Sequence, residues 1–306
     1  GAGPYFLALQ SSTLTRVPKQ RGIMAQDTFD VLNPATAQVL RTVHMASPDA
    51  IDSAVARAKA AWPAWRDTAP GTKATLLRRL AVLVAEHKEE LAGLEVLEAG
   101  HTIGNAEWEV DNVCNVVNYF AGGAERLLGA QIPVAGGLDV TFHEPFGVVG
   151  IIVPWNFPMP IASWGFAPAL AAGNTVVLKP AETTPLTALR IAELALDAGF
   201  PEGVLQVVPG YGKVAGQRLV EHPDVRKIVF TGSTATGIGI AQQVAPQLKR
   251  VTLELGGKSP TIIFADSDVE AAAKSAPLAV FDNTGQDCCA RSRILVERKV
   301  YDDVLA

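Results

Sequence analysis

The sequence predicts an α/β protein: an open parallel sheet with helices on both faces, followed by part of a second α/β domain. From residue 147 onward, short apolar runs alternate with stretches of helical spacing. The runs are continuous in Val, Ile and Leu, as in strands buried on both faces, and parallel strands need helical crossovers. After Gly256 and Gly257 a further strand–helix–strand run begins, and it predicts the second domain.

The region ahead of the sheet is predicted to be mostly helical. Asn33 and Pro34 mark a turn, and Ser47 before Pro48 is typical of an N-cap followed by proline at the first helical position. The run GAQIPVAGGLDVTFHEPFG alternates apolar and polar residues around a Gly-Gly pair, which predicts a two-stranded excursion. Helices are expected over residues 50–62, 72–98 and 106–128.

The sheet region predicts five strands in chain order. They are GVVGIIV, NTVVLK, GVLQVV, RKIVF and RVTLEL, with helices expected near residues 160–172, 184–198, 213–221 and 233–245. The second domain is expected to contain the strands PTIIFA and RILVE with a helix near residues 268–282 between them. This alternation is typical of βαβ units.

Composition limits the classes of function. The 306 residues are 48% hydrophobic and 19% charged with a net charge of −5, which suits a globular protein with a large core and disfavours a nucleic-acid partner. Three cysteines, Cys114, Cys288 and Cys289, make no disulfide framework, so we expect a reducing, cytoplasmic setting. Prolines interrupt the uncharged window between Glu144 and Lys179, which predicts buried strands and a core helix and no membrane span.

Polar and glycine-rich motifs follow four of the predicted strands. They are PWNFP, LKPAE, TGSTATG and ELGGKSP. In open α/β sheets, ligands bind outside the carboxyl ends of the strands. These four motifs therefore predict a ligand site at one edge of the sheet.

Two of these motifs fit a phosphate-bearing ligand. In TGSTATG, small residues let the backbone approach a phosphate at the start of a helix, and Ser233 can add a hydroxyl. Taken alone, however, the motif is better explained as an ordinary tight βα turn. In LKPAE, Lys179 and Glu182 can contact ribose hydroxyls, or they form a solvated pair that caps the next helix.

The other two motifs carry catalytic chemistry. The Asn156 amide, between aromatic residues and prolines, can donate to a developing oxyanion, or it is a turn asparagine bonded to its own backbone. Glu254 lies between leucines at a strand end, where burial would raise its pKa toward that of a general base; the alternative is an ion-paired structural acid.

The run GQDCCARSR raises the question of which sulfur reacts. A nucleophilic thiol must be partly exposed and able to ionise, and both Cys288 and Cys289 qualify. The residues alone leave that choice open. Cys114 lies in an apolar helical pattern with Val110, Val113 and Val117, so we expect it in the core.

Taken together, the motifs resemble those of the aldehyde dehydrogenase superfamily from about Asp30 to the last residue. PWNFP, LKPAE, FTGST, ELGGKSP and a G-Q-x-C element occur in this order with similar separations, a combination of high specificity. The resemblance implies a Rossmann-like dinucleotide-binding domain over residues 24–126 and 146–256, a hairpin for oligomerisation over 127–145 and a catalytic domain from 257 to 306. Residues 1–23 are expected to be an extension ahead of Met24.

The resemblance also implies roles for single residues. The cysteine two places after Gln, which is Cys288, is the nucleophile; Cys289 packs beside it, and Asp287 occupies a position that is cysteine in many members. Asn156 and the Cys288 backbone N–H form the oxyanion hole, and Glu254 activates water. No metal is implied, and the cofactor-binding positions are Pro154, Trp155, Lys179, Glu182, Gly212, Gly216, Phe230, Gly232, Ser233, Gly237 and Leu255.

The implied reaction is oxidation of a small aldehyde to a carboxylic acid with NAD(P)⁺ through a thiohemiacetal and a thioester. Glu182 favours NAD over NADP because an acid repels a 2′-phosphate, although Lys179 weakens this inference. The alternatives are an acylating, coenzyme A-dependent enzyme, which commonly lacks the activating glutamate, and an inactive nucleotide-binding chain.

The chain departs from the family in length. It ends at Ala306 in the helix-like run KVYDDVLA, so we expect a fragment with little activity, whose full-length parent is a homodimer or homotetramer.

Overall fold

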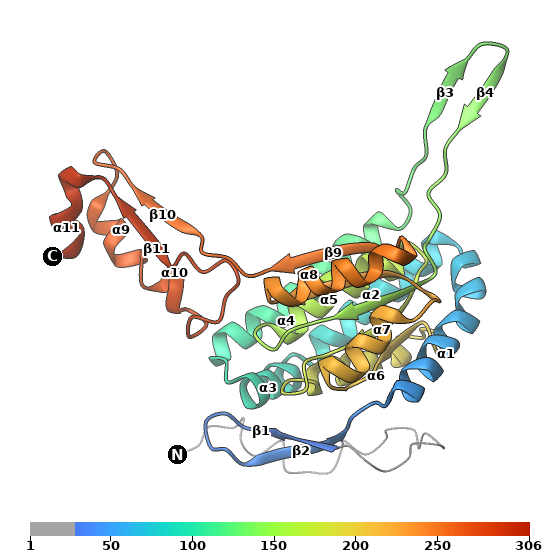
Figure 1. Cartoon of the computed structure of the whole chain (residues 1–306), viewed down its shortest axis with the longest axis horizontal. Helices are drawn as coiled ribbons and strands as arrows, with labels where there is room; N and C mark the ends of the chain where they lie inside the picture. The colour runs from blue at the N-terminus through green and yellow to red at the C-terminus, as the bar shows by residue number, and fades with distance from the viewer. Residues whose placement is uncertain (1–27) are drawn as a thin grey trace. The chain divides into compact units, whose positions relative to one another are not determined.

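The computed structural model describes residues 28–306, so the expected extension over 1–23 lies outside the described residues. The described chain divides into two compact units (Figure 1). Unit 1 comprises residues 28–231 and 239–253, and unit 2 comprises residues 232–238 and 254–306. Each unit is described by itself below.

Unit 1 is built on a five-stranded sheet with the order β7-β6-β5-β8-β9. The prediction of parallel pairing is confirmed for β5 with β6, β5 with β8 and β6 with β7. All ten residues of β5 and β6 are buried, as continuous apolar strands require. The strands are β5 (Val148–Ile152), β6 (Thr175–Lys179), β7 (Leu205–Val207), β8 (Val225–Gly232) and β9 (Arg250–Leu255).

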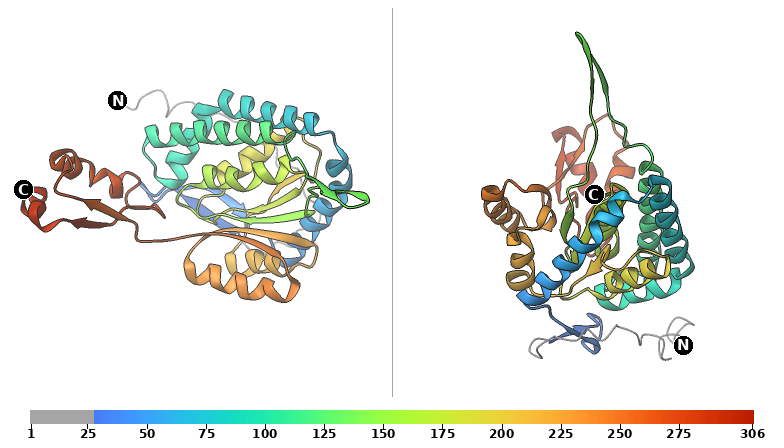
Figure 2. Two further views of the ribbon diagram at one scale, coloured as in Figure 1. Left: turned by 90° about the horizontal axis from the view of Figure 1, so that it is seen from above. Right: turned by 90° about the vertical axis from the view of Figure 1, so that its right-hand side faces the viewer.

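Helices cover both faces of the sheet, as predicted (Figure 2). Successive residues of a strand point to opposite faces. On β5, a β-carbon added to Gly150 would lie 3.0 Å from Leu219 of helix α7 (Gln217–Glu221), whereas the next residue, Ile151, lies against Gly165 of α5 (Pro158–Ala171). Two glycines thus allow close helix–strand packing on opposite faces. The largest core cluster lies on the α5 side.

The helices before the sheet differ in part from the prediction. Ser47 caps α1 (Pro48–Asp67) by accepting from the Ala50 N–H at 3.2 Å, as expected. The single helix expected over 72–98 is wrong: the chain forms α2 (Pro70–Glu86) and α3 (Lys88–Ala99). His87 lies between them as the C-cap of α2 and the N-cap of α3, and its backbone N–H and Nδ1 both contact the Leu83 carbonyl. The third helix, α4 (Ile103–Gly123), starts earlier than predicted because Thr102 caps it, and it also ends earlier, with Ala124 at its C-cap.

The remaining helices of the sheet region follow the predicted order. They are α6 (Leu186–Asp197), a π-helical turn over Gly212–Gly216 that leads into α7, and α8 (Thr234–Val244) followed by a 3₁₀ turn over Ala245–Gln247. An antiparallel pair that the sequence analysis missed, β1 (Thr28–Leu32) and β2 (Val39–His44), flanks the predicted Asn33 turn.

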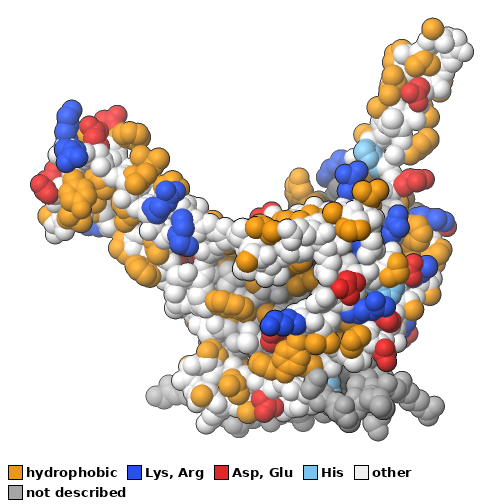
Figure 3. Space-filling view, in the orientation of Figure 1, with side chains coloured by type: hydrophobic (Ala, Val, Ile, Leu, Met, Phe, Trp, Pro, Cys, Tyr) orange, Lys and Arg blue, Asp and Glu red, His pale blue; other side chains and the backbone are white. Residues whose placement is uncertain are grey.

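The two-stranded excursion is confirmed as β3 (Gln131–Val134) paired antiparallel with β4 (Gly137–Val140). Every residue of both strands is exposed, including four apolar side chains, and Figure 3 shows apolar side chains along this hairpin. These four are Ile132, Val134, Leu138 and Val140.

Unit 2 contains the predicted second strand–helix–strand run. Strands β10 (Pro260–Ile263) and β11 (Arg293–Val296) pair in parallel. Between them, the helix expected over 268–282 is two short helices, α9 (Val269–Ser275) and α10 (Leu278–Phe281). A 3₁₀ turn over Arg298–Val300 and α11 (Tyr301–Leu305) follow. Within residues 28–306, no helix is both long enough and apolar enough to cross a bilayer.

Candidate active site

The carboxyl ends of three sheet strands lie side by side in unit 1. Ile152, the last residue of β5, pairs in register with Lys179 of β6 and with Phe230 of β8. The motifs PWNFP, LKPAE and TGSTATG therefore leave the sheet at neighbouring points of one edge. This is the edge at which open α/β sheets bind ligands.

The PWNFP segment turns the chain from β5 into α5. Pro154 is half-buried, Trp155 is 49% exposed and Asn156 is half-buried. Phe157 precedes the helix, and Pro158 occupies the first helical position, where its missing N–H costs nothing. Behind this turn, the His101 ring lies 5.8 Å from the Phe157 ring.

Lys179 is buried at the end of β6, with only 3% of its surface exposed. Its Nζ donates to the Pro180 carbonyl at 2.7 Å and lies 3.6 Å from Glu182 Oε2. Burial lowers the pKa of Lys179, and Glu182 opposes this shift. The alternative of a solvated pair is therefore wrong for the lysine. Gly216 packs on its side chain, because an added β-carbon would lie 3.5 Å from Lys179 Cδ; Gly212, at the other end of the π-helical turn, is exposed.

In unit 2, the TGSTATG residues have structural roles. Ser233 Oγ accepts from the Thr236 N–H at 3.3 Å and so caps α8. Gly237 is buried, and a β-carbon on it would meet Leu255 Cδ2 at 2.7 Å. The cap and the close packing explain Ser233 and Gly237 without a ligand. A role of either residue, or of Gly232, in cofactor binding stays a prediction.

Glu254 is exposed, so the expected burial is wrong. Residues along β9 alternate between its two faces, and Leu253 and Leu255 are half-buried on the face opposite Glu254. The leucines on either side suggested burial, but they point the other way. The Glu254 carboxylate is therefore open to water.

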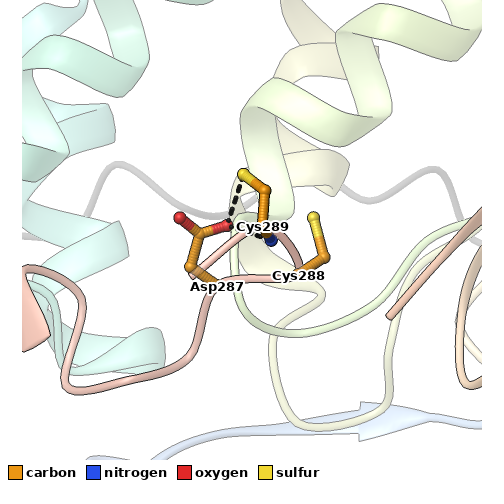
Figure 4. A group of neighbouring side chains, drawn as sticks. All are labelled: Asp287, Cys288 and Cys289. Carbon is orange, nitrogen blue, oxygen red and sulfur yellow. Dashed lines mark hydrogen bonds between the residues drawn. The ribbon is translucent and has the colours of Figure 1, made fainter. Parts of the chain in front are cut away.

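The two vicinal cysteines have different surroundings (Figure 4). Asp287 Oδ1 accepts from the Cys289 N–H at 3.0 Å and from its Sγ at 3.1 Å. The hydrogen bond between the Asp287 carboxylate and the Cys289 thiol raises the pKa of that thiol to about 11. The expected packing of Cys289 is wrong, because it is exposed while Cys288 is half-buried. Asp287 thus favours the protonated form of the Cys289 thiol, and the dashed contacts of Figure 4 join Asp287 to Cys289.

The third cysteine behaves as expected. Cys114 packs against the main core cluster, and its Sγ donates to the Ala81 carbonyl at 3.4 Å. Burial raises its pKa to about 11. This thiol is poorly suited to act as a nucleophile at neutral pH.

The loop of Cys288 lies against the segment that follows Glu254. The Cys288 carbonyl oxygen is 3.6 Å from the position that a β-carbon on Gly257 would occupy. Arg293 Nε donates to the Lys258 carbonyl at 2.7 Å, and Pro260 pairs with Arg293 at the start of β10 and β11. The ELGGKSP and GQDCC motifs are therefore neighbours within unit 2.

The sequence analysis missed a buried polar cluster in unit 1. Glu95, His101 and Glu109 each offer an atom of a type that binds metal ions, and these three atoms all lie within 4.8 Å of one another. Asp287, Cys288 and Cys289 form a second such group in unit 2. The signal was present in the spacing: Glu95 and Glu109 fall on the apolar faces of α3 and α4. Charged residues there are rare unless they are paired.

The fold and the motifs define an α/β protein with a candidate cysteine nucleophile. The carboxyl ends of its parallel strands form an edge of the kind at which open α/β sheets bind nucleotides. Residues 23–306 match the aldehyde dehydrogenase family, and the chain belongs to that family. It is 45% identical over 282 residues to the putative aldehyde dehydrogenase DhaS of Bacillus subtilis, covering 91% of this chain and 57% of DhaS.

Solved structures of aldehyde dehydrogenases share the fold of this chain. A putative aldehyde dehydrogenase from Burkholderia cenocepacia superposes with a TM-score of 0.89 at 48% identity, covering 91% of this chain and 57% of that one. An aldehyde dehydrogenase from Bacillus cereus in complex with NAD⁺ gives 0.89 at 46% identity, covering 91% and 58%. The chain thus spans little more than half the length of these relatives.

Proposed function

We propose that the protein to which this chain belongs oxidises an aldehyde to a carboxylic acid with NAD(P)⁺, using Cys288 as the nucleophile. The observation that carries this proposal is the contact of the Cys288 loop with Gly257, which joins the cysteine motif to the Glu254 motif. The hydrogen bonds of Asp287 to Cys289 support the choice of Cys288, because they occupy the neighbouring cysteine.

Cys288 thiolate adds to the aldehyde carbon and forms a thiohemiacetal oxyanion. The Asn156 amide and the Cys288 backbone N–H are the proposed donors to this oxygen. Asn156 suits the role because its segment is fixed on both sides, by β5 before it and by Pro158 of α5 after it. A fixed donor stabilises developing charge without reorganisation. Loss of hydride from the thiohemiacetal carbon leaves a thioester on Cys288.

Bound NAD(P)⁺ supplies the hydride acceptor. The residues at the strand edge fit such a group: Lys179 presents a buried ammonium beside the half-exposed carboxylate of Glu182. Those two side chains would bind ribose hydroxyls, and the carboxylate disfavours a 2′-phosphate. We therefore propose NAD as the preferred cofactor.

Glu254 completes the reaction as the general base for thioester hydrolysis. Its exposure gives the carboxylate access to water. A base that removes a proton from water as it attacks typically contributes about 10²–10⁴-fold. Its presence favours hydrolysis over transfer of the acyl group to coenzyme A.

The function is tested by aldehyde-dependent formation of NADH, measured with and without coenzyme A. Carboxylic acid formation that is independent of coenzyme A supports the proposal. A requirement for coenzyme A would favour the acylating class. NAD binding by calorimetry without any turnover would favour the inactive nucleotide-binding alternative.

The β3–β4 hairpin is proposed as an oligomerisation segment. Its four exposed apolar side chains lie on strands that contribute nothing to the core, and exposed apolar strands favour association with another chain. Sedimentation of the wild type and of a variant with Leu138→Asp and Val140→Asp would test this. If the wild type is an oligomer and the variant sediments with the same mass, the proposal is contradicted.

A further inference from the structure

Three buried polar side chains of unit 1 converge between two helices. Glu95 comes from α3, Glu109 from α4, and His101 from the connection between these helices. Both glutamates are 0% exposed and His101 is 5% exposed. Each offers one carboxylate oxygen or ring nitrogen, and these three atoms lie within 4.8 Å of one another. We call these three residues the Glu–His–Glu cluster.

The cluster lacks the partners that buried polar groups normally have. Among the described residues, its four carboxylate oxygens and two ring nitrogens are buried without a hydrogen-bond partner. His101 Nδ1 is 2.6 Å from Glu109 Oε1, an ion-pair distance without the alignment of a hydrogen bond. Most buried polar groups are hydrogen-bonded, so several unsatisfied atoms at one place require an explanation.

The charge of the cluster calls for a cation. Within residues 28–306, no Lys or Arg forms an ion pair with Glu95 or Glu109. Buried carboxylates are costly unless they are paired or coordinate a metal. Two ionised glutamates and a neutral imidazole carry two negative charges, which one divalent ion neutralises.

A third buried acid on α3 is engaged elsewhere. Both oxygens of Glu98 accept backbone N–H groups at the start of α6, from Leu186 at 2.7 Å and from Thr187 at 2.9 Å. The carboxylates that are left for a ligand are therefore those of Glu95 and Glu109.

The donor set selects the class of ion. Mg²⁺ and Ca²⁺ take oxygen ligands, whereas imidazole combined with carboxylates suits Zn²⁺ and similar transition metals. The second oxygen of either glutamate can supply the fourth ligand of a tetrahedral site. Bonds of about 2.0–2.2 Å place neighbouring ligand atoms about 3–4 Å apart. The three atoms already lie within 4.8 Å of one another, so side-chain shifts of about 1 Å close them around an ion.

We propose that Glu95, His101 and Glu109 form a structural site for Zn²⁺ or a similar divalent transition metal ion. The ion ties α3 to α4, which pack against each other. The His101 ring lies 5.8 Å from the Phe157 ring, so the site stands behind the PWNFP turn. This ion takes no part in the proposed reaction, and the inference does not depend on the proposed function.

Calorimetric titration of the chelator-treated full chain with Zn²⁺ tests the site, with Mg²⁺ as the control ion. The thiols in unit 2 can bind zinc themselves, so every protein compared carries Cys288→Ser and Cys289→Ser. The expected result is one Zn²⁺ per chain with a Kd below about 1 µM, as in structural zinc sites, and no binding of Mg²⁺. Absence of zinc binding would overturn the proposal and leave protons as the groups that neutralise the cluster.

A ligand variant shows where the zinc binds. Glu109→Gln keeps the shape of the side chain and should weaken zinc binding by more than the about 10–100-fold that loss of an outer-shell partner causes. Glu89→Gln, at an exposed position on α3, is the matched control and should bind as before. Equal affinity in both variants would mean adventitious binding and overturn the proposal. Should Glu109→Gln fail to fold, Glu95→Gln takes its place.

X-ray absorption at the zinc edge needs no change to the cluster. It should find only nitrogen and oxygen ligands at about 2.0–2.2 Å, with a single imidazole. The chain has five histidines, and a shell with two or more imidazoles, or with none, would place the ion elsewhere and overturn the proposal. Neither measurement uses aldehyde turnover, so each result stands whether or not the chain oxidises aldehydes.

Discussion

The carbonyl oxygen of Cys288 lies 3.6 Å from the point that a β-carbon on Gly257 would occupy. Residues 31 positions apart in the chain are therefore in van der Waals reach. The contact brings the GQDCC loop to the segment that follows Glu254, so a nucleophile and a base can belong to one site within unit 2. The predictions below test this site and the unit 1 residues that support it.

The first prediction separates the two vicinal thiols. Cys288→Ser should lower aldehyde-dependent NADH formation by about 10³-fold or more, because it removes the covalent step. Cys289→Ser should keep activity within about twofold, since Asp287 holds that thiol protonated at neutral pH. Limiting iodoacetamide followed by peptide mapping should label Cys288 first. Equal loss of activity in both variants would contradict the assignment.

The second prediction concerns the oxyanion donor. Asn156→Ala should reduce kcat by about 10²–10³-fold with a small change in KM, because the lost hydrogen bond forms only as charge develops. Steady-state kinetics with one aldehyde give both constants. The matched control is Asn112→Ala on the exposed side of α4, whose Oδ1 accepts from Trp164; it should keep kcat. A fall in Asn156→Ala confined to KM would argue against the role.

The third prediction concerns helix–strand packing in unit 1. A β-carbon on Gly165 would lie 2.9 Å from Ile151 Cγ2, so Gly165→Ala should lower the free energy of unfolding by about 1–3 kcal/mol. Gly239→Ala in α8, where nothing lies within 4 Å, should raise it by about 0.5–1 kcal/mol through helix propensity. Urea denaturation measures both variants. Equal effects in the two variants would mean that α5 can move away from β5.

The fourth prediction concerns pH and Glu98, whose carboxylate accepts from the N–H groups of Leu186 and Thr187. Burial raises its pKa to about 8 from the usual 4.5. The folded protein therefore binds a proton that the unfolded chain has released, and stability falls as pH rises from the lower value to the higher. Glu98→Gln should flatten this fall. Denaturant titration at a series of pH values gives the stability of the wild type and of Glu98→Gln. Parallel curves of stability against pH would contradict the raised pKa of Glu98.

Much of the sheet could be predicted because its strands are continuous in Val, Ile and Leu. A run such as GVVGIIV has few alternatives, and the motif that follows it falls at the strand end by necessity. His87 could not be predicted as a break, because a histidine between Leu- and Glu-rich stretches fits helix as well as turn. In the structure, the His87 backbone leaves helical geometry, with φ −101° and ψ 22°, and His87 caps both helices.

The candidate site could be predicted in its motifs but not in its surroundings. The exposure of Glu254 depends on which face of β9 packs, and leucines on both sides are compatible with either face. The preference for Cys288 over Cys289 is supported in the structure by the contact of Asp287 with the second thiol. His101 carries no motif, and its proximity to Phe157 arises only when α3 and α4 fold against α5.

The most direct test of the account is to trap the acyl intermediate. Glu254→Gln should still allow hydride loss but should hydrolyse the thioester slowly. After mixing with an aldehyde and NAD⁺ and quenching in acid, peptide mass spectrometry should find one acyl group per chain on Cys288, matched by a burst of one NADH. An acyl group on Cys289, or a burst with no adduct on either cysteine, would contradict the central claim.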